Sequence, residues 1–590
     1  MKPPTNAQRE KHKGSVRGQK SEVGRQRSCF LGLLSACCIV PAALLLTGCR
    51  KSEPPADLII VNGNEPESLD PAIITGLSEM RLTQGLWAGL TRLHPKTVVP
   101  IPDLAERWEL SPDKKVYAFH LRTNAVWSTG EPITADDFVY SWIRALDPKT
   151  ASDYAGQLFP IKYAEEFNAG KIKDSSLVGV RAMDARTLCV ELINPTAFFL
   201  DLCAFPTLNV VPRKIIEKYG DRWLMVRPLP ASGPYELVSW RINDKIRMRK
   251  NLRYWDAANV HTEIFDFLPI GSPNTALNLY ETGAADVVWD KDLIPVELLD
   301  DLKDRLDYHT FTYLGAYFFR FNVTRKPFDD PRVRKAFALV VDKKRLVEKI
   351  TKAGEQPASH FVPPGIANYQ SVEGLGFNPE KARQLLAEAG FPGGKGFPRF
   401  QYKFFAAAGG AAKLHAKIAV ELQQMWRDEL GIEIELQQIE RKVFYAVQSK
   451  LDYDLSQSSW IGDYNDANTF LDMFMSNNGN NRTGWSHARY DELMRAANKE
   501  TDLKLREKIF QEAETLLIQD EVPIVPLYFY VGFNYYDPAR VAGIYPNILD
   551  QHPLQDIRKI SSGGGRTETR ALSFGRHQRQ NLLTRAATTK

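Results

Sequence analysis

Apolar and polar positions follow two different periods along this chain, and they predict alternating strands and helices from about residue 58 to residue 530. Residues 58–61 form a short continuous apolar run, and residues 116–122 alternate apolar and polar positions as a half-buried strand does. Residues 432–439 alternate in the same way, and residues 523–530 are rich in aromatic side chains. We therefore predict a strand in each of these four segments.

Helix starts are marked by capping residues and by proline in the first turn. Thr134 followed by Asp137 resembles a capping box, in which each side chain accepts from a backbone N–H of the other residue. Proline is favourable in the first turn because its missing N–H has no partner there. Further helices are predicted to begin at Asp330-Pro331, at Asn378-Pro379 and after Asp502, and a helix from about 411 to 430 is predicted to end at Gly431. Because helices and strands interleave, the sequence predicts a mixed α/β fold.

The first 49 residues have the organisation of a secretory signal. Residues 1–28 are polar and basic, residues 29–46 are almost wholly apolar, and Leu46-Thr47-Gly48 places small residues before Cys49. This ending resembles the lipobox of bacterial lipoproteins, which implies a signal peptide over 1–48, diacylation of Cys49 and a lipidated tether over 49–57. The alternative is a transmembrane anchor, although this run is near the lower limit for a span and Pro41 interrupts it.

The net charge of +5 is concentrated at the two ends of the chain. Residues 1–49 carry +6 and residues 561–590 carry +5, so the remainder, 50–560, carries −6. A mildly acidic body argues against nucleic-acid binding, which needs a concentrated basic face. Residues 561–590 begin Ser-Ser-Gly-Gly-Gly, continue basic and polar, and are predicted to form a disordered basic tail.

Only two cysteines, Cys189 and Cys203, lie beyond the first 49 residues. They can form one disulfide in an oxidising compartment or remain two buried thiols, and the sequence leaves both alternatives open. No Cys/His spacing resembles a zinc site. Neither a metal nor another cofactor is predicted.

The sequence motifs that usually accompany catalysis are missing. The chain has no phosphate-binding loop, no G-x-S-x-G elbow and no H-E-x-x-H segment. The adjacent acids Asp136-Asp137 and Asp329-Asp330 stand at expected helix starts, where they need no catalytic role. We therefore predict a binding protein without catalytic residues. The alternative class is an extracytoplasmic hydrolase of peptides or glycans, which would need an acid–base or nucleophile–base pair facing one cleft.

A series of longer motifs runs through the body of the chain. They are PESLDP at 66–71, GLWAGL at 85–90, AVWSTGEPITADDFVYSW at 125–142, ASGPYELVSW at 231–240, FDDPRVRKAFALVVDK at 328–343 and WIGDYNDANTF at 460–470. In type and order these motifs resemble the signature of the oligopeptide- and dipeptide-binding proteins of ABC importers, solute-binding protein family 5. The resemblance covers roughly residues 59–560.

The resemblance implies an α/β fold of the type II periplasmic-binding-protein class, with two lobes, a hinge and an additional domain. The first lobe would combine residues 56–88, 213–269 and 531–560. The additional domain would be 89–212, and the second lobe 270–530. Two chain crossovers between the lobes would form the hinge, and the ligand would be buried when the lobes close.

The resemblance also assigns Asp463 to the α-ammonium group of a bound peptide. A carboxylate suits that task because a charge-assisted hydrogen bond is short and strong. Without the resemblance, Asp463 is typical of a loop aspartate that caps a turn. The other positions that match cleft residues of the family are Gly76, Leu77, Tyr154, Ser232, Trp460 and Tyr530. The three aromatic side chains among them are equally typical of core residues.

For the carboxylate end of a peptide, the resemblance points to His415 and Arg325. Gln457 and Gln448 stand where relatives carry cleft arginines, which leaves the preferred peptide length open. Arg441 stands where a relative has tryptophan, and we hypothesise that it restores one missing charge.

The expected function follows from these implications. A monomer, held at the bacterial periplasm or cell envelope by its lipid anchor, would capture short peptides and deliver them to ABC permease subunits with their ATPases. Family relatives that bind cell-wall (murein) peptides, nickel complexes, haem or sugars define the alternative ligands. Asp463 favours a ligand with a free amine over a sugar.

Overall fold

The computed structural model describes residues 53–290, 293–406, 410–476 and 478–560. The chain divides into two units, Met1–Pro54 and Pro55–Lys590, and the helices and strands described belong to the second, which is compact. The predicted signal peptide 1–48, the lipidation site Cys49 and the tail 561–590 lie outside the described residues. Their assignments stay predictions.

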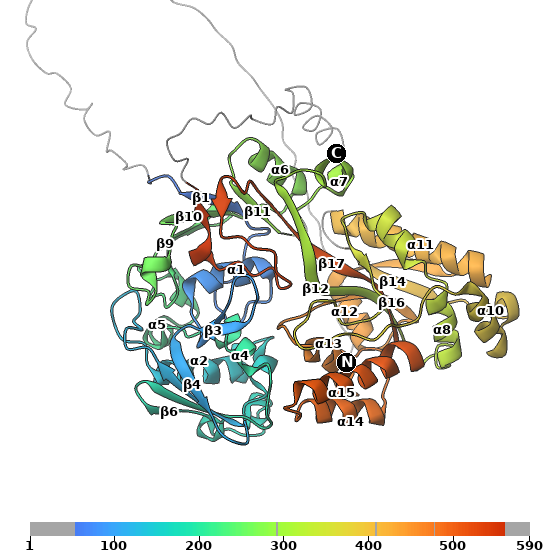
Figure 1. The fold of residues 1–590 in the computed structure, drawn as a ribbon, viewed down its shortest axis with the longest axis horizontal. Coiled ribbons are helices and arrows are strands. Elements are labelled where there is room, and N and C mark those ends of the chain that lie inside the picture. The colour runs from blue at the N-terminus through green and yellow to red at the C-terminus, as the bar shows by residue number, and fades with distance from the viewer. Residues whose placement is uncertain (1–52, 291–292, 407–409, 477, 561–590) are drawn as a thin grey trace, which may run out of the picture. The chain divides into compact units, whose positions relative to one another are not determined.

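One large mixed sheet runs through the second unit (Figure 1). Its strands, in spatial order, are β15 (Glu435–Glu440), β14 (Gln401–Ala406), β16 (Leu455–Ile461), β12 (Tyr308–Phe321), β17 (Ile524–Tyr536), β11 (Val287–Trp289), β1 (Leu58–Val61), β10 (Ile264–Leu268), β9 (Lys245–Lys250) and β8 (Tyr235–Arg241), and β13 (Gln356–Pro357) pairs with β17. The interleaving of this sheet with helices confirms the predicted mixed α/β class.

The two long central strands, β12 and β17, carry the sheet from one half to the other. They pair antiparallel along most of their length, with register shifts between Thr312 and Ala316 and between Tyr317 and Phe318. The end of β17 pairs with β11, whereas the end of β12 pairs with β16. Each strand therefore has neighbours in both halves of the sheet.

From Tyr313 to Phe321, strand β12 is buried on both faces, which explains the nearly continuous apolar sequence of this part. Tyr317 and Phe319 belong to one hydrophobic core, which includes Trp426. Phe318, on the opposite face, belongs to another core. Because side chains of a strand alternate between faces, Arg320 lies on the Phe318 face as the charged exception in this run.

A second, four-stranded sheet lies within the segment predicted to be an additional domain. Its order is β4 (Ala105–Leu110), β5 (Val116–Leu121), β7 (Thr187–Glu191) and β6 (Val180–Asp184), and a two-stranded sheet joins β2 (Thr91–Leu93) to β3 (Pro100–Pro102). Helix α2 (Ala135–Leu146) packs against β6 and β7. It opens with the predicted capping box of Thr134 and Asp137.

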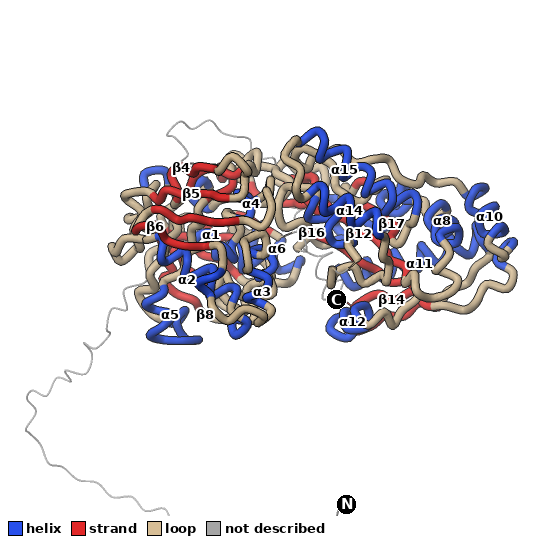
Figure 2. Tube along the Cα trace, turned by 90° about the horizontal axis from the view of Figure 1, so that it is seen from below, coloured by secondary structure: helices blue, strands red, loops and turns tan. Residues whose placement is uncertain are grey.

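Most of the predicted helix starts are confirmed by their caps. Asp330, Asn378 and Asp502 each accept a backbone N–H at the start of α8 (Pro331–Leu339), α10 (Pro379–Glu388) and α15 (Leu503–Thr515). In both views α8 lies beside α10, and α14 (Ala488–Ala497) beside α15 (Figures 1 and 2). The remaining α-helices are α1 (Leu77–Leu86), α3 (Ala164–Asn168), α4 (Phe199–Leu202), α5 (Arg213–Tyr219), α6 (Pro273–Glu281), α7 (Leu299–Leu302), α9 (Lys343–Arg345), α11 (Gly410–Leu430), α12 (Arg441–Ser449) and α13 (Asn468–Leu471), and β18 (Val541–Ala542) pairs with β19 (Arg558–Lys559).

The strand predicted over 432–439 begins three residues later, at Glu435. Helix α11 ends at Leu430, and Gly431 follows in a left-handed conformation with φ of 67°. The N–H of Ile432 then bonds back to the Trp426 carbonyl at 3.3 Å. These residues close the helix and are not available to pair in the sheet.

The two cysteines of the body are not paired with each other. Cys189 and Cys203 are buried free thiols, which decides between the two alternatives left open by the sequence.

Strand β11 pairs with β1 although they stand on opposite sides of the predicted boundary at 269–270. The exact division into lobes therefore stays a prediction.

Among the described residues, no helix has the length and apolar character needed to cross a membrane, and no group of acidic, cysteine or histidine side chains is arranged to hold a metal ion.

Candidate functional site

Asp463 lies just beyond the end of β16 and is held by neutral groups from distant parts of the chain. Its Oδ2 accepts from Gln157 Nε2 at 3.0 Å, and its Oδ1 from the hydroxyl of Tyr154 at 3.4 Å. Its backbone N–H donates to Thr469 Oγ1 at 3.2 Å. Gln157 and Tyr154 belong to the segment predicted as the additional domain, so this carboxyl joins two predicted parts of the body.

Burial raises the pKa of Asp463 to about 7, against the opposing hydrogen bonds from Tyr154 and Gln157. Asp463 lines a small opening of about 20 Å³ together with Asp201, and burial raises the pKa of Asp201 to about 8. In the described part of the chain, neither carboxyl forms an ion pair with a basic side chain. A cationic ligand group would stabilise the charged form of both.

The aromatic residues predicted at the cleft occupy different surroundings. Tyr154 packs on Phe205, with ring centroids 5.1 Å apart, and its hydroxyl reaches Asp463. Trp460 donates its indole N–H to the Thr469 carbonyl at 2.7 Å. Tyr530 stands edge-to-face on Tyr528 at 5.6 Å. Tyr154 thus contacts Asp463 directly.

Gly76 and Leu77 lie at the start of α1 and are partly exposed. A Cβ atom at Gly76 would come within 1.9 Å of Glu79 Oε2, the end of a flexible side chain, which would have to move. The position leaves backbone groups of both residues near the surface.

Three predicted residues are engaged elsewhere. Ser232 is 1% exposed, and its hydroxyl accepts from the Ala88 N–H at 3.0 Å and donates to the Val210 carbonyl at 3.4 Å. The guanidinium group of Arg325 pairs with Asp454 at 3.1 Å and Asp452 at 3.0 Å. His415 is buried, with its ring 4.7 Å from that of Phe405. None of the three lines the opening beside Asp463, and the hydroxyl of Ser232 is used within the chain rather than presented to a ligand.

A larger cavity of about 420 Å³ adjoins β16. Trp460, Gln457 and Gln448 contribute to its wall, and Gln448 Nε2 donates to Ser456 Oγ at 2.8 Å and to the Gln457 carbonyl at 2.9 Å. Arg320 and Arg482 also line this cavity, and the sequence did not single them out. The available signal for Arg320 was a lone charge inside an apolar run.

Arg441 lies close to the aromatic wall of this cavity. Its guanidinium carbon is 5.8 Å from the ring of Phe405 and 5.9 Å from that of Tyr445, and both rings line the cavity. The hypothesis that Arg441 supplies a positive charge near the ligand is thus compatible with its position.

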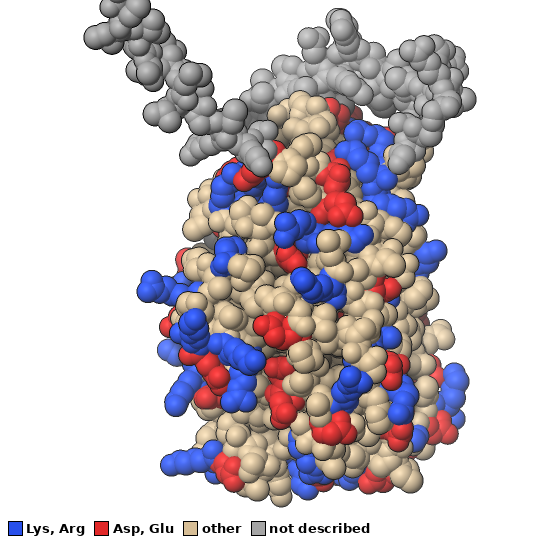
Figure 3. Space-filling model, turned by 90° about the vertical axis from the view of Figure 1, so that its left-hand side faces the viewer, with Lys and Arg blue, Asp and Glu red and all other residues tan. Residues whose placement is uncertain are grey.

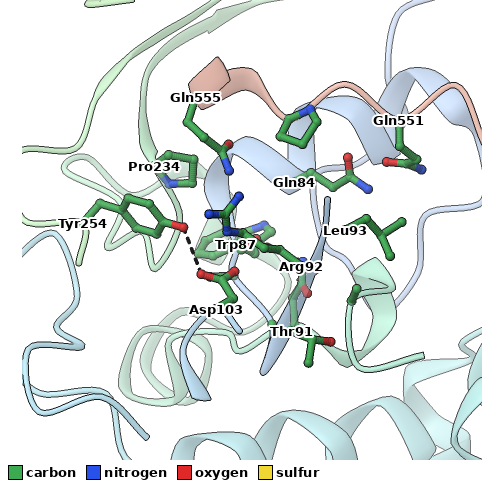
Figure 4. Close-up of a pocket in the computed structure, with 15 residues that line it drawn as sticks. Gln84, Trp87, Thr91, Arg92, Leu93, Asp103, Pro234, Tyr254, Gln551 and Gln555 are labelled. Carbon is green, nitrogen blue, oxygen red and sulfur yellow. Dashed lines mark hydrogen bonds between the residues drawn. The ribbon is translucent and has the colours of Figure 1, made fainter. Parts of the chain in front are cut away.

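A third pocket, of about 50 Å³, lies beside α1 (Figure 4). Its carboxyl group, Asp103, accepts from the hydroxyl of Tyr254 at 2.9 Å and from Trp255 Nε1 at 2.7 Å. Gln84 and Gln551, both labelled in Figure 4, also line the opening at Asp463. This pocket therefore lies next to the Asp463 opening. Its own carboxyl group, that of Asp103, already accepts hydrogen bonds within the chain.

Positive and negative charges are mixed on the face of the molecule drawn in Figure 3. Figure 3 shows basic and acidic side chains interleaved on that face, without a broad basic patch. The absence of a nucleic-acid partner stays a prediction.

Comparisons with known proteins agree on one family. The family model of bacterial extracellular solute-binding proteins, family 5 Middle, matches residues 99–482. The chain is 34% identical to the periplasmic oligopeptide-binding protein OppA of Salmonella typhimurium over 82% of this chain and 88% of the relative. It is 36% identical to the dipeptide-binding protein DppE of Bacillus subtilis over 80% of this chain and 86% of the relative.

The fold has solved counterparts. The crystal structure of a periplasmic oligopeptide-binding protein of an oligopeptide ABC transporter from Borrelia burgdorferi superimposes with a TM-score of 0.74 and 32% sequence identity. The superposition covers 86% of this chain and all of the other.

Proposed function

The chain belongs to family 5 of the bacterial extracellular solute-binding proteins, and from this premise we propose that it captures short peptides between two closing lobes and delivers them to an ABC importer. The family consists of transport binding proteins, so the chain is a binding protein and not an enzyme. Its fold is the predicted α/β type II periplasmic-binding class, with two lobes and an additional domain.

The observation that carries the peptide proposal is the state of Asp463. Its carboxyl group is largely withdrawn from water, has only neutral hydrogen-bond partners among the described residues and has a pKa raised to about 7 by burial. Burying a carboxylate without a cation is unfavourable. A peptide α-ammonium group would supply the missing charge and form charge-assisted hydrogen bonds.

Lobe closure is proposed from the route of the chain. Tyr154 and Gln157 come from the proposed additional domain, whereas Asp463 comes from the proposed second lobe. A ligand seated at Asp463 would contact both parts, and the two crossovers of the hinge would lie near residues 269–270 and, within β17, near residues 530–531. The proposed lobe boundaries are those implied by the family resemblance.

The cellular setting extends the proposal. The relatives compared above include a periplasmic protein and a component of an ABC transporter, which supports a place in the bacterial envelope beside permease subunits and their ATPases. Anchoring through diacylated Cys49 and a monomeric state complete the proposed arrangement.

The first test compares free with N-acetylated peptides. We expect di- to pentapeptides with a free amine to bind about 100-fold more tightly than their acetylated forms, because a hydrogen bond to a charged group contributes about 1.5–3 kcal/mol. Calorimetry on protein stripped of bound ligand by unfolding and refolding measures both affinities. Binding of a murein tripeptide in preference to all other peptides would redirect the proposal to cell-wall fragments, and no binding of any peptide would refute it.

Peptide affinity should also depend on pH around neutrality. Binding requires the charged form of Asp463, so affinity is expected to fall about tenfold per pH unit as pH drops below about 7. It should fall again above about 8, where the peptide amine loses its proton. Titrations between pH 5 and 9 test this shape. Asp201 and Asp472 titrate nearby, so the Asp463→Asn variant is the control, and a fall below pH 7 of the same steepness in that variant would contradict the assignment.

A further inference from the structure

Arg320 is a buried cation inside the sheet. It is 3% exposed on β12, and its guanidinium group donates to the Asn481 carbonyl at 2.8 Å, the Asn480 carbonyl at 3.1 Å and Ser458 Oγ at 2.7 Å. Its Nε is buried without a hydrogen-bond partner. All of its hydrogen-bond partners are neutral.

The positive charge of Arg320 is not balanced by a carboxylate in the described part of the chain. Burial lowers the pKa of Arg320 to about 10, and the neighbouring charge of Arg482 adds to this lowering. A buried charge is costly unless a counter-charge accompanies it. An apolar residue at position 320 would match its neighbours in β12 and would avoid the cost of burying a charge.

Arg482 brings a second guanidinium group to the same cavity. Its backbone has φ of 42°, a conformation that residues with side chains rarely adopt. The hydroxyl of Tyr453 donates to the Arg482 carbonyl, and Arg482 Nε donates to the Gly479 carbonyl at 3.3 Å. Its guanidinium carbon is 5.7 Å from the ring of Tyr445. Strained backbone of this kind persists where neighbouring contacts enforce it, often at ligand sites.

The cavity between these arginines has the composition of an anion site. Its volume is about 420 Å³, and none of the side chains that line it is acidic. Aromatic rings of Phe405, Tyr445 and Trp460 form part of the wall. The space is therefore large enough for several ligand atoms and carries uncompensated positive charge.

We propose that Arg320 and Arg482 form a carboxylate-binding subsite for the bound ligand, an inference that rests on the proposed peptide-binding function. A planar guanidinium group matches a carboxylate with two parallel hydrogen bonds. The carboxylate is either the C-terminus of a peptide or an acidic side chain. Arg325, the arginine indicated by the family resemblance, is already paired with two aspartates and is not needed for this role.

The distance between the two ends of the site suits a short peptide. Phe318 on β12 stands opposite Ser458 on β16, and Ser458 contacts Arg320. Asp463 follows five residues later, which corresponds to at most about 18 Å of extended chain. A peptide of roughly four or five residues spans this distance. Within the described parts of the chain, Asp463 has no cationic partner and Arg320 no anionic one, and one zwitterionic peptide would supply both.

The test measures the ratio of affinities for free-acid and C-terminally amidated alanine peptides of three to five residues. We expect the wild-type protein to prefer the acid at least tenfold, and Arg320→Met and Arg482→Met to reduce the preference below threefold. The ratio between free and N-acetylated peptides should be unchanged in both variants. Arg489→Met is the matched control, since that side chain is 52% exposed and pairs with Glu512 on the surface. Because Arg320 is buried, Arg482→Met carries the test if Arg320→Met does not fold.

A second series separates the two sources of the carboxylate. Amidated peptides with one glutamate at each position in turn regain tight binding if the subsite takes an acidic side chain, and remain weak if it takes the C-terminus. Either result supports the subsite. A wild-type protein that binds acids, amides and glutamate peptides equally, or an acid preference that survives in both arginine variants, would overturn it.

A peptide-independent readout distinguishes failure of the subsite from failure of the proposed function. Inorganic phosphate should raise the melting temperature of the ligand-free wild type and of Arg489→Met, and should raise that of Arg482→Met much less. If no peptide binds but this difference is observed, the peptide function fails and the anion subsite stands. If peptides bind while phosphate acts equally on all three proteins and no acid preference is seen, the subsite fails alone.

Discussion

Replacing Asp463 with asparagine is expected to weaken peptide binding by about 100-fold at pH 7.5. The substitution keeps the shape of the side chain and removes the negative charge that would balance the peptide ammonium group. A hydrogen bond to a charged partner contributes about 1.5–3 kcal/mol, which corresponds to roughly 10- to 150-fold in affinity. Partial burial and the neutral partners of Asp463 place the effect toward the upper end.

Two controls make this result specific. Asp502→Asn changes an exposed aspartate at the start of α15 to a residue that also caps helices well, and it should leave affinity unchanged. N-acetylation of the peptide should cause little further loss in Asp463→Asn, because both changes remove the same interaction. Full additivity of the two losses would mean that the ammonium group is bound elsewhere. Below pH 6 the wild-type affinity should approach that of the variant.

Replacing Glu514 with glutamine should lower the free energy of unfolding by about 3 kcal/mol. Glu514 lies on α15, is fully buried and accepts the N–H of Phe361 at 3.0 Å, of Val362 at 2.9 Å and of Val372 at 3.3 Å. Its second oxygen also accepts from the hydroxyl of Tyr369 at 2.6 Å. An amide replaces one acceptor oxygen by a donor NH₂ group, so at least one buried donor loses its acceptor, at a cost of about 1–3 kcal/mol for each such group.

Glu512→Gln is the matched control for this prediction. Glu512 is two residues away on the same helix, is 51% exposed and pairs with Arg489, so its replacement should change stability by less than about 0.5 kcal/mol. Urea denaturation followed by tryptophan fluorescence measures both variants. Equal midpoints for Glu514→Gln and Glu512→Gln would show that the buried acceptor does not hold residues 361–372 against α15.

Features that depend on neighbouring residues were predictable from the sequence. The capping box at Thr134 and the proline-started helices at Pro331 and Pro379 depend on contacts within a few residues, and the structure contains them. The strand expected from 432 begins at Glu435 because closure of α11 uses the preceding residues. The alternation of apolar and polar residues does not by itself indicate where the preceding helix ends and the strand begins.

The candidate site was less accessible to sequence reasoning, because it is assembled from distant segments. Motif resemblance pointed to Asp463 and Tyr154, but the contact from Gln157 spans 306 positions in the chain and left no local pattern. Ser232 stands in a family motif, yet its hydroxyl satisfies backbone groups. In the sequence Arg320 is only an unusual charge in an apolar run, because its neutral partners among the described residues come from β16 and from the segment near Asn481.

The irregular pairing of β12 with β17 affects how easily the sheet can bend. A regular antiparallel ladder resists bending because many hydrogen bonds must distort together, whereas register shifts interrupt that cooperation. The shifts here fall between Thr312 and Phe318, in the middle of both crossing strands. Elastic deformation would concentrate in these few residues, which are distinct from Asp463, Arg320 and Arg482. If the proposed lobe closure bends the sheet here, the rate of peptide exchange and the affinity of the site depend on different sets of side chains.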